Sequence, residues 1–377
     1  MIPNEGTLLG RAWLPSVGGP VVVTVRDGRL IDITARSEPT VRDVCELDDP
    51  VSHVRSVEGR DLGPLDEIAG NTPGQLDLVH LLAPCDFQAV KACGVTFASS
   101  MVERVIEERA AGDPLLAEEI RARVGAAIGD SLRNIRAGSK EAASVKAALI
   151  EEGLWSQYLE VGIGPDAEVF SKAQVLSSVG PGADVGLHPV SKWNNPEPEV
   201  VLTVSSAGRI VGATLGNDVN LRDVEGRSAL LLSKAKDNNA SCALGPMIRL
   251  FDATFTLDDV RRAELELTVT GEDGYVLTGH STMSEISRDP EDLVAQTIGR
   301  HHQYPDGLML FLGTLFAPTQ DRDEPGEGFT HKLGDLVEIS SEKIGTLHNV
   351  VRLSTECAPW TFGASHLMRN LAGRGLI

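Results

Sequence analysis

The chain begins with a pattern that predicts short β-strands. Residues 20–25 form a β-branched run, Asp27-Gly28 is typical of a two-residue hairpin turn, and residues 30–34 alternate apolar and polar side chains. A second apolar segment covers residues 78–84. We therefore predict a small β-rich N-terminal domain over residues 1–84.

Residues 100–155 follow a helical pattern instead. Val102, Val105 and Ile106 recur at the spacing of one helix face, and a Gly-Asp-Pro sequence at residues 112–114 ends that helix. Two further helices are predicted, near residues 114–135 and 139–153. This helical segment suits either a lid over a site or a packing and subunit interface, and the pattern favours neither.

From residue 156 onwards, short apolar runs separated by Gly, Pro and Asn turns predict mainly strands. The predicted strands cover residues 197–205, 210–215, 263–270, 308–314, 336–340 and 350–354, and the predicted helices cover residues 223–235 and 290–298. Many short strands with scattered helices indicate an α+β fold that is mainly β, rather than a doubly wound sheet.

The composition narrows the classes of partner. The 377 residues carry 54 Asp and Glu against 34 Lys and Arg, a formal net charge of −20. Such a surface repels phosphate backbones and anionic lipids, so we expect neither a nucleic-acid nor a membrane partner. The five cysteines form no metal-binding spacing, which is typical of reduced, partly buried thiols in a cytoplasmic protein without a signal peptide.

Three carboxylates form the most informative pattern. Glu197 and Glu199 are two residues apart on a predicted strand, so both side chains point to one face. Asp218 follows at the end of the next predicted strand. If the two strands form a hairpin, the end of the second lies beside the start of the first, so Asp218 would lie near Glu197 and Glu199. Three carboxylate ligands that leave coordination positions open for water and substrate favour a hard cation, Mg²⁺ or Mn²⁺. A Glu-x-Glu pattern alone is more often part of a solvent-exposed strand edge.

A lysine follows this predicted metal site. Lys234 and Lys236 both precede a polar loop at residues 237–239. Beside a metal–carboxylate site, either lysine could bind a substrate carboxylate or transfer a proton. The residues alone do not distinguish the two.

Together these segments resemble the fumarylacetoacetate hydrolase family, over about residues 85–377. The family's catalytic lysine precedes an Ala-Ser pair, which matches Lys236 and not Lys234. Its substrate-holding Gly-Thr matches Gly313-Thr314, and its Phe-x-Lys matches Phe170-Ser-Lys172. The resemblance implies a β-roll or sandwich catalytic domain over residues 85–377, Mg²⁺ on Glu197, Glu199 and Asp218, and a homodimer or homotetramer.

The chain departs from the family at one position. Family hydrolases and decarboxylases carry a His three residues before a Glu, a pair that activates water, but here Ser100 stands in place of that His and Glu103 matches the Glu. Glu103 alone can still serve as a general acid or base beside Lys236. The residues that we predict to bind substrate are Lys172, Thr314, Gly313, Ser100 and Asn239.

Further segments resemble the sugar-acid dehydratase branch of the family. They include residues 153–160, 302–307, 329–332 and 370–375. This resemblance implies a Mg²⁺-dependent hydro-lyase that converts a 2-keto-3-deoxy-D-pentonate to 2,5-dioxopentanoate in oxidative pentose breakdown. The alternative is a hydrolase or decarboxylase of acylpyruvate-like substrates, and a third possibility is a non-catalytic binding protein.

Overall fold

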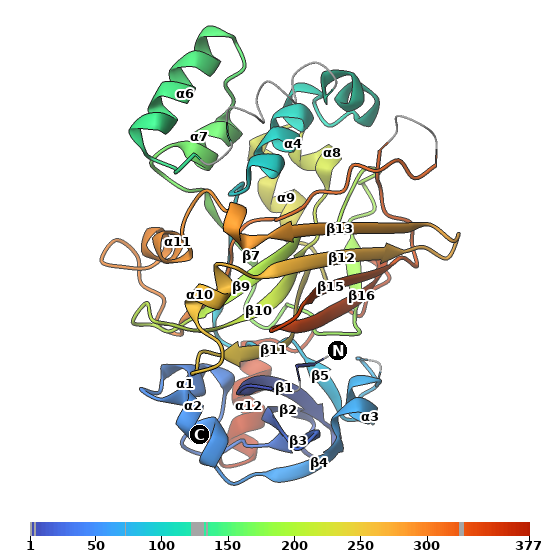
Figure 1. Cartoon of the computed structure of the whole chain (residues 1–377). Coiled ribbons are helices and arrows are strands. Elements are labelled where there is room, and N and C mark those ends of the chain that lie inside the picture. The colour runs from blue at the N-terminus through green and yellow to red at the C-terminus, as the bar shows by residue number, and fades with distance from the viewer. Residues whose placement is uncertain (1, 4, 72, 122–131, 133–134, 324–327) are drawn as a thin grey trace.

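The computed structural model of the chain describes residues 2–3, 5–71, 73–121, 132, 135–323 and 328–377. Within these residues, an eleven-stranded sheet and a five-stranded sheet form the centre of the molecule, with helices at both ends (Figure 1). The large sheet contains β1 (Leu8–Leu14), β2 (Gly19–Arg26), β3 (Arg29–Asp32), β4 (Arg60–Pro64), β5 (His80–Leu82), β6 (Ala89–Cys93), β7 (Val169–Ala173), β9 (Pro198–Val204), β10 (Ile210–Asp218), β11 (Cys242–Leu250) and β14 (Leu308–Phe311). The second sheet contains β8 (Asp184–Leu187), β12 (Glu264–Thr270), β13 (Val276–Thr282), β15 (Leu336–Ser341) and β16 (Gly345–Leu353).

The helices gather mainly around the ends of these sheets. They are α1 (Val41–Glu46), α2 (Pro50–Ser56), α3 (Leu65–Ala69), α4 (Ala98–Arg109), α6 (Lys140–Glu151), α7 (Gln157–Ile163), α8 (Arg222–Glu225), α9 (Leu232–Lys236), α10 (Leu257–Val260), α11 (Pro290–Thr297) and α12 (Ala364–Gly373). In Figure 1, α4, α6 and α7 lie at one end and α1, α2, α3 and α12 at the other. No helix in the described part of the chain is long and apolar enough to cross a membrane.

The predicted N-terminal hairpin is confirmed. β2 and β3 pair antiparallel up to Arg26 opposite Arg29, with Asp27 and Gly28 between them at φ 51° and 71°. Two successive positive φ angles are those of the turn type that matches the twist of paired strands. The Asp27-Gly28 pattern therefore located this turn correctly.

The N-terminal strands continue the large sheet rather than forming a separate one. β1 pairs antiparallel with β11, which places Leu8 opposite Arg249. The last helix returns to the same region: Asn370 donates to the carbonyl of Val17 at 2.9 Å, and Arg374 to that of Pro20 at 2.9 Å. The N-terminal unit thus contains α12 as well as the first strands, and a domain boundary near residue 84 stays a prediction.

The main core lies between the two sheets. Apolar side chains that alternate along β9 and β10, such as Leu202 and Leu215, pack there against Leu267 and Ile339 of the second sheet. On the opposite face, Val201 and Phe311 pack with the N-terminal helices α1 and α2 through residues such as Val44 and Val54. This two-sheet, mainly β architecture confirms the predicted α+β fold.

The helical segment has a core of its own. Met101 and Val105 of α4 pack with Leu149 of α6 and Leu159 of α7. The predicted helix over residues 114–135 is described only in part, since residues 122–131 and 133–134 lie outside the described residues.

One predicted helix is wrong. Residues 223–235 form α8, a short 3₁₀ turn at Ala229–Leu231 and α9 instead of one continuous helix. α8 ends at Gly226, where the chain passes close to α4: a Cβ at this position would lie 3.0 Å from the carbonyl oxygen of Glu107. Helical periodicity does not reveal such a tertiary approach.

The five cysteines are buried and form no disulfide, as expected for reduced thiols. A different buried group, Asp335, ties the long segment before β15 to the second sheet. Its carboxylate accepts hydrogen bonds from both terminal nitrogens of Arg322 at 2.6 and 2.7 Å and lies 3.0 Å from Nδ1 of His331. Burial raises the pKa of this carboxyl, but the hydrogen bonds from Arg322 and His331 outweigh it and lower the pKa to about 2.

We predict that Asp335→Asn lowers the free energy of unfolding by about 1.5–3 kcal/mol, because the buried Arg322 loses its two short hydrogen bonds to Asp335 and keeps the longer contacts to Asp273. The wild-type chain should lose this stabilisation as the pH falls from about 4, the ordinary pKa of Asp, towards 2, because the folded-state pKa is the lower one. Denaturant unfolding at several pH values measures both effects. Asp323→Asn, which removes a surface partner of Lys332, is the control and should change stability by less than about 0.5 kcal/mol. Equal stability of Asp335→Asn and wild type at pH 7 would contradict this account.

Candidate active site

The register of β9 and β10 brings three carboxylates together. Gly216 lies opposite Glu199, and the backbone N–H of Asp218 donates to the carbonyl of Glu197 at 3.0 Å. Directly opposed residues of antiparallel strands share a face, so the three side chains converge. One carboxylate oxygen from each of Glu197, Glu199 and Asp218 lies within 4.8 Å of the other two, and all three residues are buried.

Two buried lysines face this triad. Nζ of Lys236, at the end of α9, contacts Glu197 and lies 3.2 Å from Oδ2 of Asp218. Nζ of Lys172, on β7, lies 2.8 Å from Oδ1 of Asp218. Lys234 is exposed. Of the two lysines left open by the pattern, the fold therefore directs Lys236 to the triad.

Burial and crowding change the charge states of the triad. Burial, reinforced by Asp218 and Glu197, raises the pKa of the Glu199 carboxyl well above its ordinary value. Asp218 is also buried, but Lys172 and Lys236 outweigh that effect and lower the pKa of its carboxyl. The triad therefore needs more positive charge than the lysines supply if all its members are to be ionised together.

The wider cluster of buried charges has the same imbalance. The cluster holds six carboxylates and four cationic side chains. The carboxylates are those of Glu107, Glu168, Glu197, Glu199, Asp218 and Glu225, and the cations are Arg104, Lys172, Arg222 and Lys236. A divalent ion would balance the two excess negative charges. The donor set of three carboxylates, without a histidine or thiolate ligand, fits Mg²⁺ or Mn²⁺.

The backbone at Gly313-Thr314 fixes one triad member. The N–H of Gly313 donates to Oε2 of Glu199 at 2.7 Å. Gly313 adopts φ 96°, and a Cβ there would lie 2.2 Å from Oγ1 of Thr96, so only glycine fits. Ser100 donates from its hydroxyl to the carbonyl of the buried Thr314 at 2.7 Å. Ser100 thus joins α4 to the strand end that carries the site.

Glu103 lies apart from the triad. Its Oε2 is 2.7 Å from Arg121 and 3.2 Å from Arg222, and no described contact joins Glu103 to Lys236 or to a triad carboxylate. The predicted role of Glu103 as an acid or base stays a prediction.

Arg104, next to Glu103, reaches the site itself, which the sequence interpretation missed. Its guanidinium contacts Glu197 and Glu107 and lies 3.2 Å from Oε2 of Glu225. Arg222 of α8 pairs in turn with Glu107 at 2.6 Å. Arg104 and Glu107 lie on a buried face of α4, and periodicity could not identify them because charged residues usually mark the solvent face of a helix.

Glu168 is the second residue that was missed. Burial raises the pKa of its carboxyl, although Lys236 and Arg104, its strongest cationic neighbours, oppose this change. A Cβ at Gly94 would lie 2.0 Å from Oε2 of Glu168, so this carboxylate also needs a glycine beside it. Its position beside Lys236 makes Glu168 a candidate acid or base.

A signal for Glu168 was present in the sequence. Glu168, Phe170 and Lys172 are spaced by two, so along an extended segment their side chains share one face. Lys172 contacts Asp218, and Nζ of Lys236 lies 5.9 Å from the ring centre of Phe170. Extending the Phe-x-Lys motif backwards by two residues would have identified Glu168.

The side-chain amide of Asn239 forms hydrogen bonds with the backbone. Its Nδ2 donates to the carbonyls of Ser354 at 3.0 Å and Ala358 at 3.2 Å. This contact holds the segment after β16 beside the loop that follows Lys236. Substrate binding by Asn239 stays a prediction.

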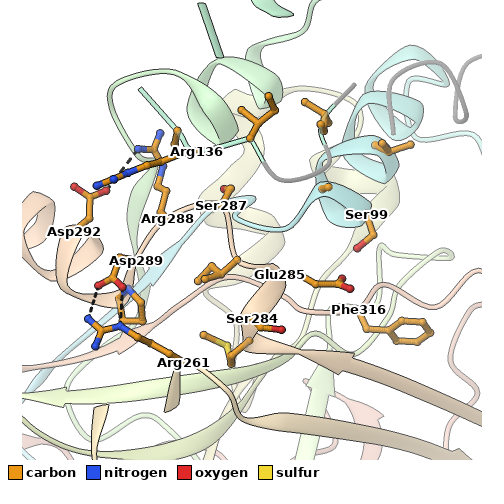
Figure 2. A pocket seen from close by; sticks show the side chains of 18 of the residues that line it. Ser99, Arg136, Arg261, Ser284, Glu285, Ser287, Arg288, Asp289, Asp292 and Phe316 are labelled. Atoms are coloured by element: carbon orange, nitrogen blue, oxygen red, sulfur yellow. Dashed lines mark hydrogen bonds and ion pairs between the residues drawn. The ribbon is translucent and has the colours of Figure 1, made fainter. Parts of the chain in front are cut away.

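A cavity of about 1850 Å³ lies outside the triad, between α4, α11 and the segment before α11 (Figure 2). Ser99 and Glu103 line it on α4, but none of the triad carboxylates does. Some of its charged side chains pair with one another, as Arg261 does with Asp289 at 2.7 Å. The cavity is therefore separate from the triad.

Comparison with known proteins places this site in a family. The family model described as fumarylacetoacetate (FAA) hydrolase C-terminal matches residues 164–352. A probable 2-keto-3-deoxyxylonate dehydratase of Haloferax volcanii is 34% identical over 263 residues, 69% of this chain and 81% of that protein. A 2-dehydro-3-deoxy-D-arabinonate dehydratase of Saccharolobus solfataricus is 31% identical over 188 residues, 49% of this chain and 58% of that protein.

Solved structures share the fold. A 2-keto-3-deoxy-D-arabinonate dehydratase in its apo form superposes with a TM-score of 0.64 at 22% identity, over 92% of this chain and 99% of the other. The same kind of enzyme, complexed with magnesium and 2,5-dioxopentanoate, gives a TM-score of 0.63 at 22% identity, over the same shares of both chains. The family match, the extended sequence identity and the shared fold agree with one another: this chain belongs to the fumarylacetoacetate hydrolase family.

Proposed function

We propose that this chain is a Mg²⁺-dependent hydro-lyase that converts a 2-keto-3-deoxy-D-pentonate to 2,5-dioxopentanoate and water. The observation that carries the proposal is the buried triad of Glu197, Glu199 and Asp218 with Lys236 in contact. The Haloferax relative, named a probable dehydratase of this substrate class, supports the choice of substrate. So does the structural neighbour that holds magnesium and 2,5-dioxopentanoate.

The reaction requires a proton to leave C3 and hydroxide to leave C4. Held by the triad, Mg²⁺ would act as a Lewis acid towards the carboxylate and 2-oxo group of the substrate, which makes the C3 protons more acidic. Loss of water gives an unsaturated keto acid, whose rearrangement places the aldehyde at C5. No nucleotide cofactor is required.

Lys236 suits the stabilisation of negative charge in this reaction. It is buried, but Asp218 and Glu197 outweigh burial and raise the pKa of its ammonium group. The ammonium group of Lys236 would donate hydrogen bonds to the developing enolate. Lys172 holds Asp218 in place from the other side.

Glu168 suits the proton transfer. Its raised pKa brings the carboxyl closer to the pH at which it can both accept and return a proton. We propose that Glu168 takes the proton from C3 and returns it to the departing hydroxyl, so that the eliminated water is formed within the site. Glu103, held by two arginines, would then support α4.

Hydrolysis of an acylpyruvate is the alternative reaction. It needs a group that activates water, and in other members of the family this is the His that Ser100 replaces here. Because the Ser100 hydroxyl already donates to the carbonyl of Thr314, it is poorly placed to act as a base. Loss of water from the substrate itself requires no activated water molecule.

Finer properties belong to the same proposal. We infer a role in oxidative pentose breakdown, a cytoplasmic location and assembly as a homodimer or homotetramer, all supported by the family resemblance.

We predict that chelator-stripped protein forms 2,5-dioxopentanoate from 2-keto-3-deoxy-D-pentonate only when Mg²⁺ is restored. Mass spectrometry of the product provides the readout, because dehydration gives one aldehyde acid whereas cleavage gives two fragments. Cleavage of an acylpyruvate at a comparable rate would favour the hydrolase alternative. Absence of product with metal bound would reject the proposed substrate.

We further predict that Glu168→Gln lowers kcat by roughly 10²- to 10⁴-fold, the usual contribution of a general acid or base. Glu103→Gln is the matched variant, since it makes the same change on α4, and should lower kcat far less. If Glu168 acts as the base, wild-type kcat/KM should rise with pH up to the raised pKa of Glu168. The reverse order of the two variants would assign the role to Glu103 instead.

A further inference from the structure

Both carboxylate oxygens of Glu197 contact cationic side chains. Oε2 contacts Nζ of Lys236, and Oε1 contacts Nη2 of Arg104. A carboxylate held at both oxygens cannot turn about its last side-chain bond without breaking one of these contacts. Because each carboxylate oxygen has more than one acceptor position, Glu197 can keep both contacts and still bind a metal ion.

Arg104 holds two further carboxylates on its other side. Its Nη1 contacts Glu107 and lies 3.2 Å from Oε2 of Glu225, while Nη2 contacts Glu197. One planar guanidinium therefore joins carboxylates from α4, α8 and the segment that enters β9. An ammonium group is a compact point charge on a flexible stem and does not offer the same fixed fork of donors.

The contacts that hold Arg104 extend to a second buried arginine. Glu107 accepts from Nε of Arg222 at 2.6 Å, and Arg222 donates to the carbonyl of Pro318 at 2.9 Å. The guanidinium of Arg222 also lies 4.5 Å from the ring centre of Trp193. Arg104, Glu107 and Arg222 are all more than nine-tenths buried. Packed side chains with fixed partners keep one orientation, so these contacts direct Nη2 of Arg104 at the triad.

We propose that Arg104 is a positioning residue that sets the orientation of Glu197 for the metal ion. This rests on the proposed function only in that the triad holds a divalent cation, and not on the identity of the reaction. Groups that hydrogen-bond a metal ligand fix its direction, and their loss typically weakens metal binding or activity 10- to 100-fold. Through Arg104, helix α4 contributes to the metal site although it carries none of the proposed ligands.

A role of Arg104 in charge balance alone makes a different prediction. A cation beside the triad offsets negative charge whatever its shape, so exchanging it for another cation would leave the metal affinity unchanged. The orientation of Glu197 depends instead on the planar fork. Arg104→Lys separates the two roles, because it keeps the charge and removes the fork.

The test measures the affinity of chelator-stripped protein for Mn²⁺ by electron paramagnetic resonance. Arg104→Lys should weaken Mn²⁺ binding roughly 10- to 100-fold. The spectrum of the Mn²⁺ that still binds should differ from that in wild type, because this spectrum reports the arrangement of the ligands. Arg109→Lys is the matched control: it makes the same change on α4 at an exposed residue that donates to the carbonyl of Gly153, and it should bind Mn²⁺ as wild type does.

Denaturant unfolding without metal shows whether Arg104→Lys is folded. If it is not, Arg222→Lys takes its place, because it keeps the charge and loosens Glu107, which holds Arg104. None of the described contacts of Arg222 is to a triad carboxylate. Arg222→Lys should then weaken Mn²⁺ binding in the same direction.

Wild-type Mn²⁺ affinity in the folded variant would overturn the inference, and so would equal weakening in Arg109→Lys. Wild type that binds no Mn²⁺ would remove the metal site and the inference together. Because no substrate is present, failure of the proposed dehydration leaves these results unchanged. The failure of the reaction is therefore distinguished from the failure of the Arg104 assignment.

Discussion

The arrangement of this molecule depends on keeping several carboxylates ionised in a place that excludes water. An isolated buried charge is very costly, so each carboxylate must meet a cation at short range. Lys236, Lys172 and Arg104 supply part of that charge around Glu197 and Asp218. The remaining excess of negative charge lies on carboxylate oxygens, without a histidine or thiolate ligand in the triad, which fits a small divalent cation such as Mg²⁺.

The fold satisfies this constraint with elements that are far apart in the sequence. The β9–β10 hairpin aligns the triad, β7 brings Lys172 from one edge of the large sheet, and α9 brings Lys236. Helix α4 adds Arg104 from the helical segment, so that segment takes part in the charge balance of the site. The N-terminal unit joins the large sheet where β1 pairs with β11. The other neighbour of β11 is β10, which carries Asp218.

Local patterns predicted the parts of the site that lie on regular strands. The period of two along a strand placed Glu197 and Glu199 on one face, and the hairpin placed Asp218 beside them. The family resemblance selected Lys236 over Lys234, and the buried position of Lys236 agrees with that selection. The mainly β fold also followed from strand patterns and turn residues.

The features that the sequence did not reveal depend on contacts between elements that are far apart in the sequence. Arg104 is a charged residue on a helix, and nothing local indicates that the face carrying it is buried against Glu197. The close approach of Gly226 to Glu107 of α4, at the end of α8, is likewise not visible in the local sequence pattern. Glu168 was predictable by extending strand alternation one step further back from Phe170 and Lys172.

The central claim, that the triad holds one divalent cation, is tested most directly by titrating chelator-stripped protein with Mn²⁺ and measuring free Mn²⁺ by electron paramagnetic resonance. The account predicts one ion bound per chain in wild type, competition by Mg²⁺, and loss of this site in Asp218→Asn, with Asp323→Asn unchanged as the surface control. Stoichiometric binding that persists in Asp218→Asn, or no binding by a folded wild type, would contradict it.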